Sequence, residues 1–195
     1  MSPRARQARR PQKPPPLRDA AVELAPVSNH VWRPVLLLAA IGALIYANTL
    51  TNPLVLDDGS TVVENEQIRD LTSAAVLSPE RELPVAGRPV ANVSFALNYA
   101  LGGPNLIGYR VVNISIHVAC ALLLFGIVRR TLEVSRHARD LSNRSTYIAF
   151  AVALLWLVHP LNTDAVAYLT QRTESLMGMF YLLTLYASLR AVTPA

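Results

Sequence analysis

Four long apolar runs constrain the fold of this chain more than any other feature. Residues 34–50 and 111–128 approach the ~20 apolar residues that a helix needs to cross a bilayer, whereas 147–158 and 176–189 are shorter. Extended into their polar ends, the shorter runs also become plausible spans, and a buried soluble helix is the alternative for them. The expected spans are about 34–50, 109–128, 146–161 and 173–189. The sequence predicts an all-α, polytopic membrane protein with about four transmembrane helices.

The composition agrees with this fold class. Of the 195 residues, 52% are hydrophobic and only 16% are charged, which is more apolar than an average soluble domain. The net charge of +5 does not indicate a nucleic-acid partner, because the basic residues are concentrated at the N-terminus and in one short middle segment. Cys120 is the only cysteine, so the chain can form neither an internal disulfide nor a thiol-pair metal site.

The charges between the apolar runs predict an orientation, because Lys and Arg accumulate on the cytoplasmic side of a span. Residues 1–33 are basic and proline-rich, and we expect them to form a disordered cytoplasmic tail. Residues 51–108 carry seven carboxylates and three arginines and should lie outside, whereas 129–145 contains five arginines and should lie inside. Arg190 and the tail 191–195 should also lie inside, so both termini are predicted to be cytoplasmic. The protein itself is expected in the plasma membrane or the endoplasmic reticulum membrane.

The predicted outer loop, 51–108, is too long for a simple hairpin and should have structure of its own. Its stretch RPVANVSFALNYALGG (88–103) has Pro89 where a helix could begin and two glycines where it could end. Its apolar side chains suit a helix that lies in the membrane interface. Upstream, TVVENEQIRDLTSAAV (61–76) is expected to form a second short helix.

Two adjacent carboxylates, Asp57 and Asp58, follow the first span directly. At the outer mouth of a membrane bundle, such a pair could act as a general base and its partner. Crowding and partial desolvation would raise the pKa of one carboxyl toward the range in which it can exchange protons. The alternative is a solvated acidic turn in which Asp58 or Ser60 caps the following helix. The spacing alone does not decide between the two.

A second polar group lies in HPLNTDAVAYLTQRTES (159–175), also expected outside. If Pro160 opens a helix that continues into the fourth span, one helical face carries Asp164, Tyr168, Gln171, Arg172 and Ser175. That face could meet solvent, or it could line a cavity where Arg172 binds a phosphate. His159 could transfer protons or simply form hydrogen bonds at the membrane interface.

Polar residues within the second run should face the bundle interior. Asn113 and His117 are four residues apart on one helical face, and they could serve helix–helix hydrogen bonding or a substrate. The four histidines, His30, His117, His137 and His159, show no metal-ligand spacing, so no protein-only zinc site is predicted, although a divalent cation is left open. Phosphate-loop and nucleophile-elbow patterns are not found either.

Three blocks together identify a family resemblance. VLDDGSTVVENEQIRD (55–70), GRPVANVSFALNYALGG (87–103) followed by YRVVNISIH, and HPLNTDAVAYLTQRTESL (159–176) resemble, in order and spacing, the N-terminal part of integral-membrane GT-C glycosyltransferases. The nearest likeness is to the O-mannosyltransferase-like branch that carries tetratricopeptide repeats. The resemblance covers roughly residues 34–190.

This resemblance implies a reaction and roles for particular residues. The donor would be a polyprenyl-phosphate sugar held in the membrane lipid, and the acceptor would be a hydroxyl of an extracytoplasmic protein or glycan. Asp57 would be the general base and Asp58 its partner. Arg172 and Arg88 would stabilise the phosphate of the leaving lipid. The residues that would shape the outer cavity are His159 and Asp164.

The chain also departs from the family pattern. Such enzymes have more spans and a repeat domain, and position 164 holds Asp where Glu is commoner in the motif. The alternative function is therefore a non-catalytic membrane scaffold or truncated relic that needs a partner membrane protein. A third hypothesis, that the protein transports a solute, is supported only by the polar residues within the spans.

Overall fold

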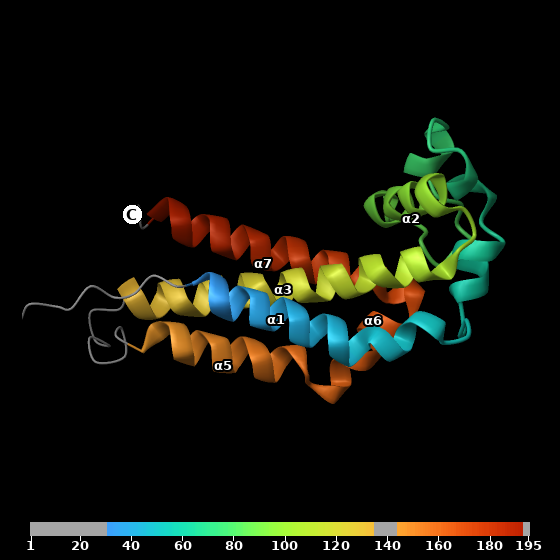
Figure 1. Ribbon diagram of the computed structural model, residues 1–195. Helices are drawn as coiled ribbons and strands as arrows, with labels where there is room; N and C mark the ends of the chain where they lie inside the picture. Colours follow the sequence, from blue (N-terminus) through green and yellow to red (C-terminus); the bar gives the residue numbers. More distant parts are fainter. Residues whose placement is uncertain (1–30, 135–143, 193–195) are drawn as a thin grey trace, which may run out of the picture.

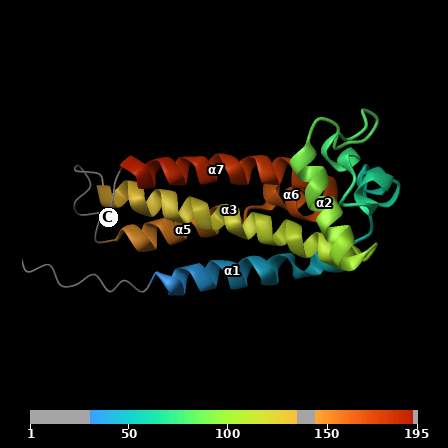
Figure 2. The same cartoon turned by 90° about the horizontal axis from the view of Figure 1, so that it is seen from above.

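The computed structural model describes residues 31–134 and 144–192. Four long helices run side by side, and the loop between the first two of them folds at one end of the bundle (Figure 1, Figure 2). The long helices are α1 (Trp32–Tyr46), α3 (Leu106–Val134), α5 (Ser145–Leu157) and α7 (Arg172–Val192). Residues 1–30 of the predicted basic tail, with His30, and much of the predicted cytoplasmic segment 129–145, with His137, lie outside the described residues. Trp32 and Arg33, which the sequence assigned to the tail, form the start of α1.

Within the described residues, three helical stretches are long and apolar enough to cross a membrane: Trp32–Thr51, Leu106–Val134 and Leu169–Val192. The first of these is α1 extended by a 3₁₀ turn, Ala47–Thr51. A fourth span results if α5 and Pro160–Ala167, which are bent by 56° relative to each other, count as one. The predicted fold class, an all-α polytopic membrane protein with about four transmembrane helices, is confirmed.

Side chains from α1 and α3 stabilise the bend after α5. Proline cannot donate a backbone hydrogen bond, so Pro160 starts a new 3₁₀ turn and the last carbonyls of α5 need other donors. The Tyr46 hydroxyl donates to the Leu157 carbonyl at 3.1 Å, and His117 Nε2 lies 3.1 Å from the same oxygen. Asn162 Nδ2 donates to the Trp156 carbonyl at 2.6 Å. His117 therefore faces the bundle interior, as predicted.

Small residues allow the helices to pack closely. A Cβ at Gly42 on α1 would lie 2.7 Å from Val118 Cγ2, and one at Gly126 on α3 would lie 2.7 Å from the Tyr186 ring. The apolar core between α1, α3 and α5 consists of Leu38, Ala121, Phe125, Ala149, Ala153 and Leu157. Close contact of this kind drives helix association in lipid, where burial of apolar area contributes little.

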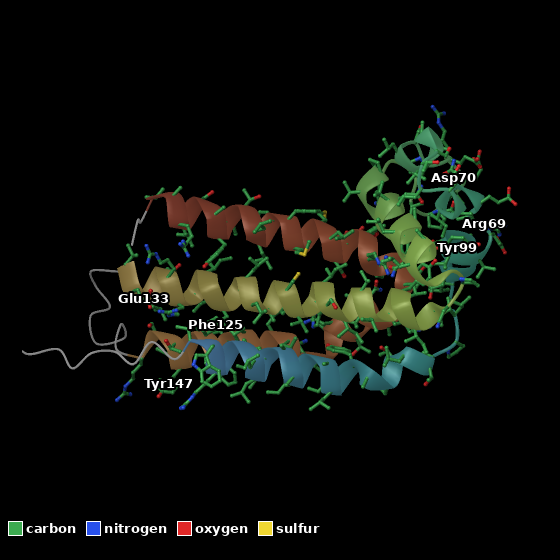
Figure 3. All side chains as sticks on the ribbon, turned by 45° about the horizontal axis from the view of Figure 1, so that its top comes forward. Arg69, Asp70, Tyr99, Phe125, Glu133 and Tyr147 are labelled. Atoms are coloured by element: carbon green, nitrogen blue, oxygen red, sulfur yellow. The ribbon has the colours of Figure 1, made fainter. Side chains whose placement is uncertain are left out.

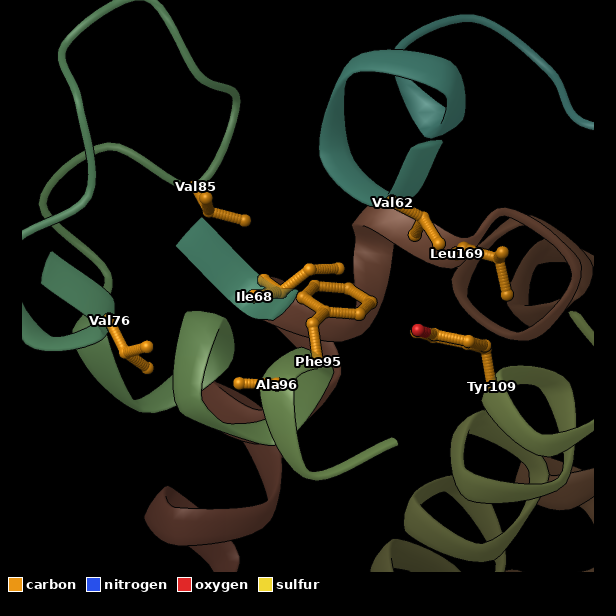
Figure 4. Packing of buried hydrophobic residues seen from close by; sticks show 8 residues of the cluster. All are labelled: Val62, Ile68, Val76, Val85, Phe95, Ala96, Tyr109 and Leu169. Carbon is orange, nitrogen blue, oxygen red and sulfur yellow. The ribbon is translucent and has the colours of Figure 1, made fainter. Parts of the chain in front are cut away.

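The loop at the end of the bundle is organised around α2 (Pro89–Gly102). Pro89 occupies its first turn and Gly103, with φ of 58°, follows its last residue, so the helix predicted at 88–103 is confirmed. Figure 4 shows the buried cluster that α2 shares with the loop, α3 and the segment before α7. Its members are Val62, Ile68, Val76, Val85, Phe95, Ala96, Tyr109 and Leu169.

The second helix predicted at 61–76 does not form as one helix. The chain instead makes three short turns, Gly59–Val63, Glu66–Arg69 and Ala74–Leu77. Asn65 and Ser73 accept hydrogen bonds from backbone N–H groups two residues ahead, and such local bonds compete with a continuous helix. At this end the labelled Arg69 and Asp70 point outward, whereas Glu133 and Tyr147 lie toward the other end (Figure 3).

A buried arginine ties this loop to the bundle. Arg110 on α3 is fully buried, and its guanidinium donates to the carbonyl oxygens of Asn52, Pro53 and Ala167 at 2.7, 3.1 and 2.9 Å. These carbonyls belong to the exits of the first span and of α6 (Thr163–Ala167). The segment that follows the first span and the end of α6 are therefore both hydrogen-bonded to the Arg110 side chain.

We predict that Arg110→Met lowers the free energy of unfolding in detergent by ~3 kcal/mol or more. Three carbonyl oxygens would lose their hydrogen bonds to a charged donor, and such bonds contribute about 1.5–3 kcal/mol each. Arg190→Met is the matched control, because Arg190 is exposed at the end of α7 and its loss should cost less than ~0.5 kcal/mol. Equal stability of the two variants would contradict the structural role of Arg110.

Candidate functional site

Asp58 is fully buried and anchors the first loop to the segment before α7. Its Oδ1 accepts hydrogen bonds from the backbone N–H and the hydroxyl of Thr170, both at 3.0 Å, and its Oδ2 accepts from the Val55 N–H at 3.3 Å. Although Asp58 precedes the turn Gly59–Val63, its side chain does not cap that turn. The interpretation of Asp58 as a solvated cap is therefore wrong, because the carboxylate is used as a buried tether.

Asp57 has the opposite environment, since it is exposed. The Tyr168 hydroxyl donates to Asp57 Oδ2 at 3.1 Å and accepts from the Asp57 N–H at 3.2 Å, so one phenol fixes both the side chain and its backbone. Burial first, and then the hydrogen bond and charge of Asp57, raise the pKa of the Tyr168 phenol. Tyr168 therefore stays protonated and available as a donor.

A strained turn presents Asp57. Leu56 has φ of 47°, a left-handed conformation that an L-residue with a side chain adopts only at a cost of ~1–2 kcal/mol. The Asp58 N–H donates to the Val55 carbonyl at 3.0 Å and closes the turn. The tether at Asp58 thus holds the backbone in a conformation that turns Asp57 toward solvent.

Asp57 lines a polar pocket between the loop and the start of α7. The pocket has a volume of about 390 Å³. Its lining residues are Asp57, Pro84, Arg88, Tyr168, Thr170, Gln171, Thr173 and Glu174. Of the six residues predicted for the site, Asp57 and Arg88 thus come together on one cavity.

An apolar groove adjoins this polar pocket. It has a volume of about 270 Å³ and runs between the start of α2 and α7. Its lining residues are Gly87, Arg88, Pro89, Val90, Ala91, Thr173, Leu176, Met177 and Phe180. Arg88 and Thr173 line both cavities, so a charged group stands where an apolar surface meets a polar one.

Arg88 forms an ion pair at this junction. Its Nη2 donates to Glu174 Oε1 at 3.0 Å and its Nη1 donates to the Pro84 carbonyl at 3.2 Å. The side chains of Arg88 and Glu174 are 50% and 46% exposed. An ion pair this open to water stabilises a fold by only ~0–1 kcal/mol, so its position matters more than its strength.

Arg172, by contrast, is fully buried and lines neither cavity. Its Nε donates to Asn113 Oδ1 at 2.7 Å, its Nη1 to Asn98 Oδ1 at 2.6 Å, and its Nη2 to the Tyr109 carbonyl at 2.8 Å. The guanidinium carbon also lies 4.2 Å from the ring centroid of Phe95. Each guanidinium nitrogen thus has a protein partner, and the predicted contact of Arg172 with a phosphate stays a prediction. Asn113 faces the bundle interior, as predicted.

The single polar face expected along 164–175 is not present. The backbone is extended at Tyr168, between α6 and the 3₁₀ turn Leu169–Gln171, so the segment is not one continuous helix. Residues on either side of the break point in different directions. Asp164 is consequently exposed on α6 while Arg172 is buried.

His159 and Asp164 lie outside both cavities. His159 is exposed, and its Nδ1 accepts from the Leu161 N–H at 3.3 Å at the start of a 3₁₀ turn. Neither residue is among those that line the polar pocket, and their part in shaping an outer cavity stays a prediction. Across 31–134 and 144–192, no group of three or more His, Cys, Asp or Glu side chains is placed to hold a metal ion.

The sequence did not single out Glu174, Thr170 or the partnership of Tyr168 with Asp57. Tyr168, Thr170 and Glu174 all fall within the block 159–176 that carries the family resemblance. Their contacts join distant positions of the chain: Tyr168 and Asp57 are 111 residues apart, Thr170 and Asp58 are 112 apart, and Glu174 and Arg88 are 86 apart. Spacing along one segment could not reveal such contacts.

Replacement of Asp58 should destabilise the protein. We expect Asp58→Asn to lower the free energy of unfolding by about 1.5–3 kcal/mol, because an amide offers one oxygen to the Thr170 donors and turns an NH₂ group toward the Val55 N–H. Asp164→Asn makes the same chemical change at an exposed site and should be neutral. If both variants unfold alike, the tether does not contribute to stability.

The chain is similar to curated proteins named protein O-mannosyl-transferases. A relative from Caenorhabditis elegans is 32% identical over 164 residues, which are 78% of this chain and 22% of the relative. One from Drosophila melanogaster is 32% identical over 161 residues, or 78% and 17% of the two chains. A human relative is 27% identical over 164 residues, or 76% and 22%. Neither a family model nor a solved structure matches the chain.

These relatives confirm the resemblance that the three motif blocks predicted. The chain spans about a fifth of their length, 22% and 17% for the first two. The matched part includes most of the described residues, because it covers 78% of the chain. This polytopic membrane chain is thus related, over 78% of its length, to a segment of the protein O-mannosyl-transferases.

Proposed function

We propose that this chain provides the donor and general-base part of a membrane glycosyltransferase site, which moves mannose from a polyprenyl-phosphate carrier to a hydroxyl of a protein acceptor. Mannose and the protein acceptor come from the names of the relatives. The observation that carries the proposal is the meeting of the apolar groove with the polar pocket at Arg88. A lipid-linked sugar has the same order of parts: an apolar chain, a charged phosphate and a polar sugar.

The donor fits this order as follows. The prenyl chain lies in the apolar groove against α2 and α7, where Leu176, Met177 and Phe180 offer apolar contact. The phosphate reaches Arg88, whose guanidinium can form two parallel hydrogen bonds to phosphate oxygens. The sugar then occupies the polar pocket, beside Asp57.

In the proposed reaction, Asp57 accepts the proton of the acceptor hydroxyl as its oxygen attacks the anomeric carbon. A new carbon–oxygen bond forms, the bond from the anomeric carbon to the phosphate oxygen breaks, and polyprenyl phosphate leaves with the bonding electrons. Displacement from the opposite face inverts the configuration. Arg88 stabilises the negative charge that develops on the phosphate. The exposure of Asp57 supports this role, since an acceptor protein can reach it.

The orientation in the membrane follows from the same arrangement. The residues that line the polar pocket belong to the loop before α2 and to the segment that leads into α7. Figure 1 shows this part of the chain at the α2 end of the bundle, and the start of α1 and the end of α7 at the other end. With the basic segments inside, the pocket faces the extracytoplasmic side and both termini are cytoplasmic. An acceptor in a secretory or cell-surface compartment would then meet a donor dissolved in the same leaflet.

Asp57→Asn tests the general-base role. In membranes that contain the native protein with this substitution, mannosyl transfer should fall by about 10²–10⁴-fold, because the amide cannot accept the proton. Asp70→Asn is the control, since Asp70 is exposed, bonds locally to Thr72 and does not line the polar pocket. Undiminished transfer with Asp57→Asn would exclude this base and favour the scaffold hypothesis.

Tyr168→Phe tests whether the phenol orients Asp57. Removing one hydrogen bond to a charged group should lower kcat about tenfold and leave KM for the donor unchanged, because the ring still lines the pocket. Tyr181→Phe, on the exposed face of α7, should change neither constant. A rise in donor KM with an unchanged kcat would instead assign Tyr168 to donor binding.

A further inference from the structure

The junction of the two cavities is already occupied by an anion. The Glu174 carboxylate holds Arg88 Nη2 at 3.0 Å, while Arg88 Nη1 is held by the Pro84 carbonyl at 3.2 Å. Glu174 lines the polar pocket, whereas Arg88 lines both the pocket and the apolar groove. An anion that binds the Nη2 donor now held by Glu174 must therefore compete with this carboxylate.

We propose that Glu174 is an internal substitute for the donor phosphate: it pairs with Arg88, and an anionic prenyl lipid must displace it to bind. This inference rests on the proposed function, because it takes the donor phosphate to be the ligand of Arg88. It assigns to Glu174 a specificity role. A neutral prenyl lipid cannot replace the carboxylate, so the pocket rejects lipids that have lost their phosphate.

The exposure of the pair makes displacement feasible. Both side chains are about half exposed, 50% and 46%. An ion pair this exposed favours its paired over its unpaired state by a factor of about five or less. A phosphate can offer Arg88 two charge-assisted hydrogen bonds, where Glu174 uses one oxygen. The exchange therefore favours the phosphate. The competing carboxylate makes the affinity for the phosphate lower than it would be at an unpaired arginine.

The positions of both residues on their helices support the exchange. Arg88 immediately precedes the first turn of α2, and Glu174 lies in the first turn of α7. The N-terminal end of a helix attracts negative charge, so the start of α2 favours a phosphate beside Arg88. For the same reason, the released Glu174 carboxylate remains stabilised at the start of α7. Displacement thus requires rotation of one side chain and no change in the helices.

The test is equilibrium binding of farnesyl phosphate to the full chain in a neutral detergent. We expect Glu174→Gln to bind farnesyl phosphate about fivefold more tightly than the wild type, the factor that corresponds to loss of the competing ion pair. Farnesol, which has the same chain without phosphate, should bind both proteins equally. Arg88→Gln should remove the preference for farnesyl phosphate over farnesol.

A matched control removes an ion pair elsewhere. Glu133→Gln breaks the pair with Arg129, which has an N–O distance of 2.8 Å at the opposite end of the bundle, and should not change binding. Because Glu174 is exposed, Glu174→Gln should retain the wild-type unfolding temperature. Glu174→Ala serves as a second variant and should show the same gain in affinity.

Different outcomes separate this inference from the proposed function. If the wild type prefers farnesyl phosphate and Arg88→Gln loses that preference, but neither Glu174 variant binds more tightly, competition by Glu174 is wrong while the donor site stands. If the wild type binds farnesyl phosphate no better than farnesol, the phosphate site at Arg88 is wrong, and the inference falls with it. Equal binding of inorganic phosphate and farnesyl phosphate would show a free-phosphate site and would also overturn the inference.

Discussion

One buried guanidinium, that of Arg172, sets the geometry on which the candidate site depends. It bonds to Asn98 on α2 and to Asn113 and Tyr109 on α3, while it belongs itself to the first turn of α7. A buried charge is tolerable only when its donors are satisfied, so these three helices can meet in only a narrow range of arrangements. The two residues that follow it, Thr173 and Glu174, are thereby fixed opposite the start of α2, where Arg88 lies.

The adjacent carboxylates lie in opposite environments. Asp58 is buried and binds the first loop to Thr170, which precedes Arg172 by two residues, and Asp57 is exposed on the strained turn that this tether stabilises. Adjacent residues on a turn project in different directions, so one can serve the fold while the other serves chemistry. The same segment, 168–174, thus holds the tether of Asp58, the phenol that contacts Asp57 and the partner of Arg88.

Patterns within single segments predicted the local structure well. The spans followed from apolar run lengths, and α2 followed from Pro89 and its terminal glycines, because these signals act between near neighbours. The expected helix at 61–76 and the expected polar face along 164–175 were wrong, since Asn65, Ser73 and the extended Tyr168 break the helical period. Whether Arg172 would be buried depended on α2 and α3, which no pattern within its own segment reveals.

Our central proposal is that one polyprenyl-phosphate sugar spans the apolar groove, Arg88 and the polar pocket. Photo-crosslinking with a prenyl phosphate that carries a diazirine on its chain, followed by peptide mapping, tests this most directly. The claim predicts labels on Met177 and Phe180 of α7, which line the groove, and their loss when unlabelled prenyl phosphate competes. Labels confined to the exposed apolar face of α1 or α5, such as Leu44 or Leu155, would contradict it.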